Sequence, residues 1–552
     1  MSTLPRPTNT LVTPLLTDLY QITMTYAHWK NSRHNDAAIF ELFFRKNPFR
    51  GEYTIFCGLD EVLKHVDNFK FTEDDINYLK QTPSLQECDT EFWDYLLNLD
   101  CSSVTLEAMK EGTIAFPRIP LLVVKGPLGI AQLLETTLLT LVNYPSLIST
   151  NAARMVVAAR DRILPTIPND LPKQCLQVPK CVEFGLRRAQ GPDGGFSASK
   201  YSSVAGFVAT SNVQAGKLLG LNIAGTHAHS FVQAYSTLEE VENMTLADKK
   251  GEPVLLLPIV VKLRNTLGDR YLTTNNGELA AFIAYACAFP RSFLCLIDTY
   301  DTLSSGLLNF CLVAMVLDDM GYPSAGIRLD SGDLAYLSLE CAKMFQEMAK
   351  DRPSFDELQI VASNDINEEV LQSLNKQGHA VTVFGIGTNL VTCQAQPALG
   401  CVYKLVEISG RPRIKLSEDI DKVLIPGEKH PYRLYGVHGV PILDLLISQG
   451  ENPPVACERV LCRHPFIERK RAAVTSSKVV PLHHVVFANG KVTIPPPTLE
   501  ETKQYVADQL NLVRPDILRY INPTPYKVSV SNALFQFLHE LWQAETPVAE
   551  LS

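Results

Sequence analysis

Two histidines, His227 and His229, lie in the short segment AGTHAHSF, residues 224–231. The apolar run Leu218–Ile223 comes directly before this segment and predicts a β-strand. In α/β enzymes, polar side chains that follow the carboxyl end of a strand often carry the chemistry. Because histidine changes its protonation near neutral pH and can act as a nucleophile, this segment is the first candidate for an active site.

Four further strand-like runs also end in polar residues. They are Phe293–Ile297 with Asp298; Gly326–Leu329 with Arg328, Asp330 and Asp333; Ile360–Ala362 with Ser363, Asn364 and Asp365; and Val381–Phe384 with Gly385, Gly387 and Thr388. Because parallel strands end at a common edge, we expect these side chains to meet there. Acids, an arginine and a glycine-containing turn at successive strand ends indicate an active site.

The turn Gly385-Ile-Gly387-Thr388 is suited to phosphate binding. Glycines let backbone N–H groups converge on a phosphate, and Thr388 adds a hydroxyl. The turn lacks the third glycine of a dinucleotide site and the lysine of a P-loop, which favours a single terminal phosphate. Arg187 and Arg188, beside the glycine-rich loop 191–195, suit either anion binding or a surface turn.

The remaining polar and aromatic residues extend this interpretation. Asp330 and Asp333 suit ribose hydroxyls or a Mg²⁺ ion held with a pyrophosphate, and Arg328 offers a planar fork for a carboxylate. Phe184 and Tyr20 are aromatics that can stack on a flat ring. Together these residue types fit a phosphorylated sugar, a metal–pyrophosphate and an aromatic acid.

Two alternatives start from the same residues. His227, His229, Asp298 and Asp330 could ligate a divalent metal in a barrel hydrolase, which leaves Arg328 and the glycine-containing turn without a role. A regulatory ligand-binding protein without catalytic activity does not explain why so many acids follow strand ends.

The elements that position these residues predict an α/β fold. Strands alternate with helical stretches at 304–320, 334–350 and 367–377, which indicates parallel βαβ units and a barrel. A helix is expected to begin at Thr17 or Asp18, a strand to span 37–44, a kinked helix 128–160 and another helix 200–219. We expect an N-terminal α/β domain at 1–160, a barrel domain at 161–405 with a proline-rich insertion at 164–180, and a C-terminal region at 406–552 that packs on the N-terminal domain.

Composition narrows the class of protein. The 552 residues allow several domains, and a net charge of −9 argues against nucleic-acid or anionic-membrane partners. Thirteen cysteines without a CxxC pair indicate a reducing compartment, and Cys457, Cys462 and His464 lack an obvious fourth metal ligand. The apolar runs are shorter than the roughly 20 residues of a membrane span, and no secretory signal is visible. We therefore expect a cytosolic protein.

Ten segments in order resemble the nicotinate phosphoribosyltransferase family. They are TDLYQITM (17–24), FELFFRKNPF (40–49), STNAARM (149–155), EFGLRRAQGPDGG (183–195), ATSNVQAG (209–216), AGTHAHSF (224–231), IDTYDTLSSG (297–306), GIRLDSGDL (326–334), FGIGTNLVT (384–392) and VYKLVE (402–407). They cover most of the chain from about residue 14 to about residue 410, and the resemblance is weaker beyond that point.

The resemblance implies a type II phosphoribosyltransferase fold, an irregular α/β barrel with an α/β domain formed from both chain ends. The implied reaction is the ATP-coupled transfer of phosphoribosyl from 5-phosphoribosyl 1-pyrophosphate to nicotinate, giving nicotinate mononucleotide and pyrophosphate. This reaction is the first step of NAD synthesis from nicotinate, and its ATP coupling places it in the ligase class. The resemblance further implies Mg²⁺ or Mn²⁺, ATP as co-substrate, and a homodimer.

The resemblance also assigns roles to residues, with the metal ligands left open. The assignments are His229 as a phosphohistidine and Asp330 as a second catalytic residue; Tyr20, Phe184, Thr226 and Arg328 for nicotinate; and Asp333, Gly385, Gly387 and Thr388 for the phosphoribosyl pyrophosphate. Tyr20 is expected to reach the site of a second subunit. His227 departs from the expected pattern. We expect its side chain on the opposite face from His229, because residues i and i+2 share a face only where a strand stays regular. The neutral Asn212, where amide-using relatives carry an acid, favours a carboxylate substrate.

Overall fold

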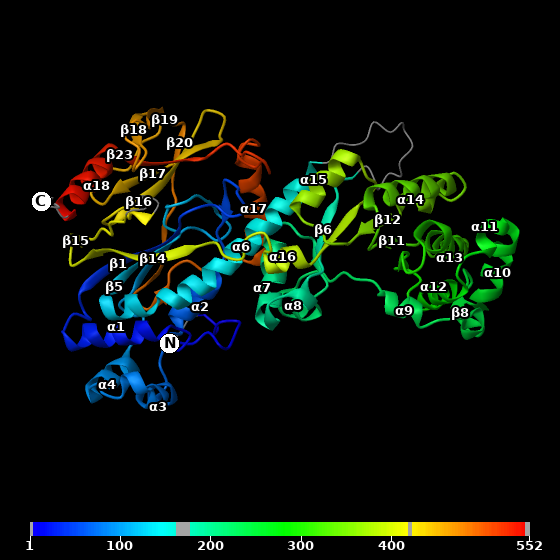
Figure 1. The fold of residues 1–552 in the computed structure, drawn as a ribbon, viewed down its shortest axis with the longest axis horizontal. Helices are drawn as coiled ribbons and strands as arrows, with labels where there is room; N and C mark the ends of the chain where they lie inside the picture. The colour runs from blue at the N-terminus through cyan, green and yellow to red at the C-terminus, as the bar shows by residue number, and fades with distance from the viewer. Residues whose placement is uncertain (1–3, 162–176, 418–421, 547–552) are drawn as a thin grey trace, which may run out of the picture. The chain divides into compact units, whose positions relative to one another are not determined.

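A computed structural model describes residues 4–161, 177–417 and 422–546, which form two compact units (Figure 1). Unit 1 consists of Met1–Asn151 with Ala395–Ser552, and unit 2 of Ala152–Gln394. We expected boundaries at 160/161 and 405/406, and those domain limits stay a prediction. Residues 164–176 of the expected proline-rich insertion lie outside the described residues.

Unit 1 is built from both ends of the chain around a seven-stranded antiparallel sheet. The strand order is β15-β14-β1-β5-β3-β21-β22. The bounds are β1 (Ala37–Phe44), β3 (Thr105–Ala108), β5 (Leu122–Pro127), β14 (Cys401–Ile408), β15 (Arg411–Pro412), β21 (His484–Ala488) and β22 (Lys491–Val492). β1 pairs with β14 on one side and with β5 on the other, so N-terminal and C-terminal strands share one hydrogen-bonded ladder. The expected α/β domain formed from both chain ends is confirmed.

A second sheet of unit 1 comes entirely from the C-terminal part of the chain. Its order is β19-β18-β23-β17-β16-β20, and the bounds are β16 (Lys429–Tyr435), β17 (Pro441–Ser448), β18 (Arg459–Arg463), β19 (Arg471–Thr475), β20 (Lys478–Pro481) and β23 (Lys527–Ser531). Leu434, Leu443, Leu445, Ile447 and Cys462 form the apolar core on one face of this sheet.

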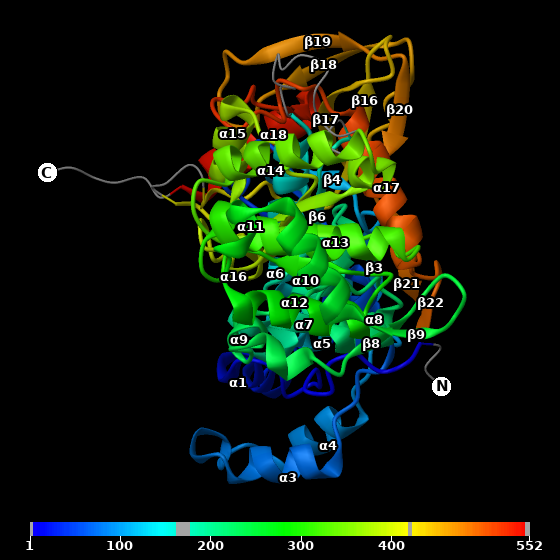
Figure 2. The ribbon, with the colours of Figure 1, turned by 90° about the vertical axis from the view of Figure 1, so that its right-hand side faces the viewer.

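The helices of unit 1 complete the covering of its strands. They are α1 (Leu19–Lys30), α2 (Leu59–Asp67), α3 (Glu73–Gln81), α4 (Thr90–Asn98), α5 (Leu128–Leu133), α17 (Leu499–Leu512) and α18 (Asn532–Glu545), with the short pair β2 (Thr54–Ile55) and β4 (Ile114–Ala115). Asp18 is the N-cap residue of α1, as expected. α6 (Glu135–Arg160) contains Pro145 within the expected long helix. Figure 2 shows α3 and α4 at one end of unit 1, away from its second sheet, which contains β16 to β20.

Unit 2 is organised around a six-stranded parallel sheet with the order β10-β11-β12-β13-β6-β7. The strands are β6 (Lys180–Glu183), β7 (Ala209–Thr210), β10 (Leu294–Leu296), β11 (Gly326–Leu329), β12 (Gln359–Ala362) and β13 (Val383–Ile386). The alternation of strands and helices that the sequence predicted is confirmed. In the described residues the ladder ends at β10 on one side, and beyond β7 it continues only as an isolated parallel bridge between Thr210 and Ile223. The closure of a barrel therefore stays a prediction.

The helices of unit 2 include the expected βα connections. They are α7 (Gly191–Val204), α8 (Val213–Leu219), α9 (His229–Gln233), α10 (Leu256–Leu267), α11 (Asp269–Leu272), α12 (Asn276–Ala288), α13 (Leu307–Asp319), α14 (Leu334–Ala349), α15 (Glu368–Gln377) and α16 (Thr388–Thr392), beside the hairpin β8 (Thr245–Ala247) and β9 (Pro253–Leu255). The segment Thr302–Asp319 is long and apolar enough to cross a membrane, but 78% of it is buried, as in a core helix. A Cβ on Gly306 would lie 1.8 Å from the Ile297 carbonyl oxygen, so only glycine lets this helix pack on the end of β10.

Two expectations about the segment 191–223 were wrong. Residues 218–223 do not form the expected strand, because α8 continues through Leu219 and ends on Gly220 in the left-handed conformation. The end of the run is extended, and Ile223 forms an isolated parallel bridge with Thr210 of β7. The Asn212 side chain accepts the Ala215 N–H and starts this helix, a capping signal that outweighs the apolar run. The glycine-rich loop 191–195 is the first turn of α7, which has a proline at its N-terminus, and the helix expected at 200–219 is interrupted by β7.

Candidate active site

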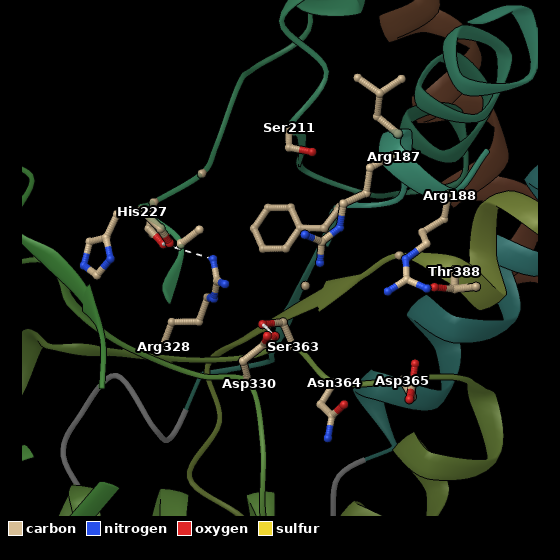
Figure 3. A pocket seen from close by; sticks show the side chains of 17 residues that line it. Arg187, Arg188, Ser211, His227, Arg328, Asp330, Ser363, Asn364, Asp365 and Thr388 are labelled. Carbon is tan, nitrogen blue, oxygen red and sulfur yellow. Dashed lines mark hydrogen bonds between the residues drawn. The ribbon is translucent and has the colours of Figure 1, made fainter. Parts of the chain in front are cut away.

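A cavity of about 620 Å³ lies at the carboxyl ends of five neighbouring strands of unit 2 (Figure 3). Its lining follows β6, β7, β11, β12 and β13, with further residues from the segment between α8 and α9. The lining residues are Phe184, Leu186, Arg187, Arg188, Ser211, Gly225, Thr226, His227, Ala228, Arg328, Asp330, Ser363, Asn364, Asp365, Gly385, Gly387 and Thr388. The structure thus brings the predicted strand ends together at one edge of the sheet.

The end of β13 provides a surface of bare backbone. A Cβ on Gly385 would lie 2.4 Å from the Phe184 ring, and a Cβ on Gly387 would lie 3.2 Å from the Phe184 carbonyl oxygen. Phe184 is itself held in register, because its N–H donates to the Ile386 carbonyl at 2.8 Å. The two glycines therefore allow the aromatic ring and the phosphate-type turn to occupy the same cavity.

Two nitrogens of the Arg328 guanidinium differ in their hydrogen bonding. Its Nη1 donates to Thr226 Oγ1 at 3.0 Å, while its Nε is buried and has no hydrogen-bond partner among the described residues. Burial is the main cause that lowers the pKa of Arg328 from its usual value. A buried guanidinium N–H without a partner is costly, and a planar anionic acceptor such as a carboxylate would satisfy it.

Three acidic and hydroxyl groups surround the loop after β11. Ser363 Oγ donates to Asp330 Oδ1 at 2.6 Å, and the Asp330 N–H donates to Asp298 Oδ2 at 3.1 Å. Asp298 Oδ1 is buried and has no hydrogen-bond partner in the described part of the chain. Figure 3 shows Asp330 and Ser363 together at the floor, with Arg328 on one side and Arg188 and Thr388 on the other. The site thus places a carboxylate between cationic groups.

His229 begins helix α9, next to the cavity-lining Ala228. Its Nδ1 lies 3.1 Å from Thr299 Oγ1, and its Nε2 lies 3.9 Å from Asp330 Oδ2. The side chain is 40% exposed. One ring nitrogen is therefore positioned by a hydroxyl, while the other is accessible and faces a carboxylate of the site.

His227 has a different environment. It is buried, its Nε2 accepts the Leu296 N–H at 3.3 Å, and its ring packs edge-on against Tyr285. Burial lowers the pKa of His227 to about 4, so the ring is neutral at physiological pH. Residues 224–228 form no strand, so the faces of a strand do not describe His227 and His229, and His227 lines the cavity.

Metal-ligand clusters are absent from the described residues: none of them form a group of three or more His, Cys, Asp and Glu side chains able to hold a metal. His227 Nε2 already accepts a backbone N–H, so this nitrogen is not free for the hydrolase alternative, whereas His227 Nδ1 has no partner among the described residues. Cys457 is exposed and Cys462 is buried, and their interpretation as incidental cysteines stays a prediction.

Three predicted site residues are not part of the cavity lining: His229, Asp333 and Tyr20. Asp333 is exposed and caps α14 by accepting the Tyr336 N–H at 3.0 Å. Tyr20 belongs to unit 1, where it lies on α1 with 47% of its surface exposed. Their roles stay predictions.

Glu183, for which we predicted no role, supports the loop beside the cavity. This carboxylate is buried and accepts hydrogen bonds from the hydroxyls of Ser199 and Thr210 and from the Gly185 N–H. It therefore fixes the loop that carries Phe184. Its signal was an acid inside an apolar strand, CVEFG. Asp365, recognised only as part of a polar strand end, lines the cavity with a left-handed φ of 45°.

Comparison with known proteins agrees with this geometry. Residues 179–442 match the family model described as "Nicotinate phosphoribosyltransferase (NAPRTase) family", and residues 15–143 and 428–538 match the models for the N-terminal and C-terminal domains of nicotinate phosphoribosyltransferase. The chain belongs to the nicotinate phosphoribosyltransferase family. Membership makes it an enzyme and implies NAD synthesis from nicotinate.

Relatives in this family match along nearly the whole chain. The nicotinate phosphoribosyltransferase of Dictyostelium discoideum is 50% identical over 556 residues, covering 99% of this chain and 91% of its own. The nicotinate phosphoribosyltransferase of Homo sapiens is 41% identical over 543 residues, with 97% of each chain covered.

Solved structures agree on the fold. A crystal structure of human nicotinic acid phosphoribosyltransferase matches with a TM-score of 0.80 and 38% identity, covering 96% of this chain and 100% of that one. A nicotinate-nucleotide pyrophosphorylase from Pyrococcus furiosus matches with a TM-score of 0.57 at 18% identity, covering 93% and 98%, which shows a shared fold. The type II phosphoribosyltransferase fold class is confirmed.

Proposed function

We propose that this enzyme transfers phosphoribosyl from 5-phosphoribosyl 1-pyrophosphate to nicotinate, coupled to ATP hydrolysis, which places it in the ligase class. The products are nicotinate mononucleotide and pyrophosphate. One observation carries the proposal: Arg328, the carboxylate of Asp330 and the glycine-containing turn at Thr388 line a single cavity, and Arg328 Nε has no partner among the described residues. These groups match an aromatic acid, a sugar and a phosphate.

Nicotinate would bind at the Arg328 side of the cavity. Its carboxylate would accept a hydrogen bond from Arg328 Nε, while Arg328 Nη1 stays bound to Thr226 Oγ1. The Thr226 hydroxyl, which donates to the His227 carbonyl at 3.2 Å, would turn to donate to the carboxylate instead. The Phe184 ring lines the same cavity and offers a stacking surface for the pyridine. Asn212, whose side chain caps α8 and donates to Ser199 Oγ at 3.2 Å, adds no negative charge that would repel the acid.

The phosphoribosyl group would bind toward Arg188 and Thr388. The backbone of Gly385 and Gly387, the Thr388 hydroxyl and the Arg188 guanidinium would hold its terminal phosphate. The pyridine nitrogen attacks the anomeric carbon as pyrophosphate leaves, through a sugar that carries positive charge. The Asp330 carboxylate would stabilise that charge. Asp333 is proposed to join the site only when the phosphoribosyl pyrophosphate is bound.

A Mg²⁺ or Mn²⁺ ion fits the acidic residues of this region. Asp298 Oδ1 is buried without a partner in the described chain, and Asp298 Oδ2 already accepts the Asp330 N–H. Mg²⁺ in such sites uses one or two carboxylates together with substrate phosphates, so a larger ligand cluster is not required. The ion, when bound by Asp298 and Asp330, would stabilise negative charge on the leaving pyrophosphate.

ATP coupling would proceed through His229. The Nδ1–H would donate to Thr299 Oγ1, which leaves the Nε2 lone pair free to attack the γ-phosphorus of ATP. An N–P bond forms as the bond to ADP breaks, and water later releases the phosphate. A phosphate on Nε2 would lie beside Asp330 and change the charge that the phosphoribosyl pyrophosphate meets.

Product analysis tests this proposal. The purified protein is incubated with Mg²⁺, 5-phosphoribosyl 1-pyrophosphate and either nicotinate or nicotinamide, with and without ATP. We expect nicotinate mononucleotide, formed faster with ATP, and no product from nicotinamide. No mononucleotide from either base would contradict the transferase. A His229→Ala protein whose rate responds to ATP as the wild type does would contradict the phosphohistidine alone.

We also propose a cytosolic homodimer in which Tyr20 of each chain reaches the site of the other. The support is that Tyr20, although predicted to bind nicotinate, is half exposed on a helix of unit 1. Mixing an inactive Arg328→Ala chain with an inactive Tyr20→Ala chain tests this, because a shared site would restore one functional site per mixed dimer. Absence of restored activity in verified mixed dimers would contradict it.

A further inference from the structure

A second cavity, of about 650 Å³, lies entirely within unit 1. It is formed on one face of the six-stranded sheet, over β17, β18, β19 and β23, and by the loops around residues 45–52 and 117–118. Its volume falls in the range of about 300–1,000 Å³ that is usual for small-molecule sites. None of the residues assigned to the transferase reaction lines it.

The lining of this cavity is strongly basic. It contains five Arg and Lys residues and a single carboxylate, that of Glu52; the five are Arg45, Arg118, Lys470, Arg471 and Lys527. Arg45, Arg471 and Lys527 have no ion-pair partner among the residues that the structure describes. Glu52 is already engaged by the Tyr526 backbone and the Asn47 side chain, and burial raises its pKa. The charges of Arg45, Arg471 and Lys527 are therefore not neutralised by an ion pair within the described residues, which favours an anionic ligand.

Arg118 is held in a backbone conformation that arginine rarely adopts. Its φ is 69°, in the left-handed region, and its N–H donates to the Phe44 carbonyl at 2.8 Å. Its guanidinium lies 4.7 Å from the centre of the Phe466 ring. Such conformations persist where the surroundings fix them and occur preferentially at functional sites. The strain is consistent with an arginine that is positioned for a ligand.

The floor and one wall of the cavity are apolar and rigid. Leu443, Cys462 and Val474 belong to the packed face of the sheet and also line the cavity. The Tyr526 ring stacks on Phe116 with centroids 3.5 Å apart, and its hydroxyl hydrogen-bonds to the buried Asp444 at 3.0 Å. A small inorganic anion would gain nothing from contact with this apolar surface, whereas a ligand with a flat ring would bury the ring against it.

One neutral donor completes the lining. His464 Nδ1 accepts the N–H groups of Phe466 and Ile467, both at 3.1 Å, so the neutral ring carries its proton on Nε2. Burial, followed by the charges of Arg118 and Lys470, lowers the pKa of His464. The positive charges of Arg118 and Lys470 therefore both act on the His464 ring.

We propose that this cavity binds a nucleoside phosphate, with the phosphate among the Arg and Lys side chains and the base against the apolar floor and Tyr526. The site is separate from the transferase cavity, since every residue that lines it belongs to unit 1. Binding does not depend on the proposed reaction, so either proposal can fail without the other.

Calorimetric titration of the full chain with AMP tests the site. We expect one AMP per chain, and at least about tenfold weaker binding to the double variant Arg471→Ala/Lys527→Ala, because both cations are exposed strand residues whose removal leaves the fold intact. The matched control is Arg459→Ala/Lys491→Ala, which removes the same charge from exposed strand residues outside the cavity. We expect this control to bind within about twofold of the wild type.

Further titrations separate the parts of the proposal. Adenosine should bind much more weakly than AMP, because it lacks the anion, and inorganic phosphate should bind more weakly because it lacks the ring. Equal binding of adenosine and AMP, no AMP binding by the wild type, or equal losses in the two double variants would overturn the proposal. Loss of AMP binding in Arg328→Ala would place AMP in the transferase cavity and would overturn it as well. Thermal unfolding of each variant verifies that it is folded.

Discussion

The two cavities of this enzyme are similar in size but differ in how they are built. In unit 2, the lining follows the carboxyl ends of adjacent parallel strands, and glycines expose the backbone itself. In unit 1, the lining consists of side chains that project from the face of a mainly antiparallel sheet, together with two loops. The first arrangement supplies acids and cations around a reacting centre, whereas the second supplies cations and an apolar floor. The cavity of unit 2 is therefore suited to catalysis, and the cavity of unit 1 to binding alone.

The largest expected effect is a loss of catalytic rate that leaves ligand binding in the cavity of unit 1 unchanged. Asp330→Asn keeps the shape of the side chain and removes the charge that would stabilise the cationic sugar. We expect kcat to fall by about 10²- to 10³-fold, the cost of losing one electrostatic stabiliser of a transition state. Steady-state kinetics with nicotinate measure this loss. AMP binding in unit 1 should be unchanged, and a joint loss of both would show that the two cavities are not independent.

The next effect concerns recognition of the acid. Arg328→Ala removes the buried guanidinium, including the Nε that has no partner in the described residues. We expect kcat/KM for nicotinate to fall by about 10²-fold, because truncating one member of a buried charge pair costs about 2–5 kcal/mol. The nicotinate-to-nicotinamide preference should shrink by a similar factor. A variant that loses rate but keeps its preference would assign the selectivity to another residue.

The part of the transferase cavity that lies at the ends of strands could be predicted from the sequence. The strands that carry Arg328, Ser363 and Gly385 were found because each is an apolar run that ends in polar residues, and parallel pairing forces such ends together. The segment before His227 was predicted to be a strand because an apolar run alone does not distinguish a strand from a helix. The Asn212 cap favours a helix there. Glu183 was missed because its role lies in hydrogen bonds behind the site.

The cavity of unit 1 could not be predicted at all. Its lining comes from stretches of chain as distant as Arg45, Arg118, His464 and Lys527, and no local motif connects them. Alternation along a strand places Lys527 on a face, but which loops cover that face is decided by tertiary packing. Placing Tyr526 on Phe116 likewise requires the fold. Side-chain cavities of this kind become visible only in three dimensions.

A smaller effect tests the role of bare backbone in unit 2. Gly385→Ala places a methyl group 2.4 Å from the Phe184 ring, so the ring must move. We expect KM for nicotinate to rise about tenfold with a smaller change in kcat, since the ring serves binding. Gly410→Ala, at a glycine with nothing within 4 Å, is a control for glycine loss, although its φ of 72° adds strain of its own. An unchanged KM in Gly385→Ala would argue against stacking on Phe184.

The smallest expected effect is on the pH dependence of stability, and it involves one buried histidine in each unit. Burial lowers the pKa of both His65 in unit 1 and His227 in unit 2 to about 4. The unfolded chain takes up a proton at each near pH 6.5, whereas the folded chain does so only near pH 4. The free energy of unfolding should therefore fall as pH drops from about 6.5 to 4, by up to about 1.4 kcal/mol per pH unit for each histidine.

Tryptophan fluorescence reports on only one of these histidines, because Trp29, Trp93 and Trp542 all belong to unit 1. In urea unfolding at pH 7 and pH 5, His65→Gln should reduce the pH dependence of the fluorescence transition, whereas His227→Gln should leave it unchanged. This follows if each unit unfolds around its own core. Equal reductions in the two variants would show that the units unfold as one, and protonation in the transferase cavity would then also weaken the nucleotide cavity of unit 1.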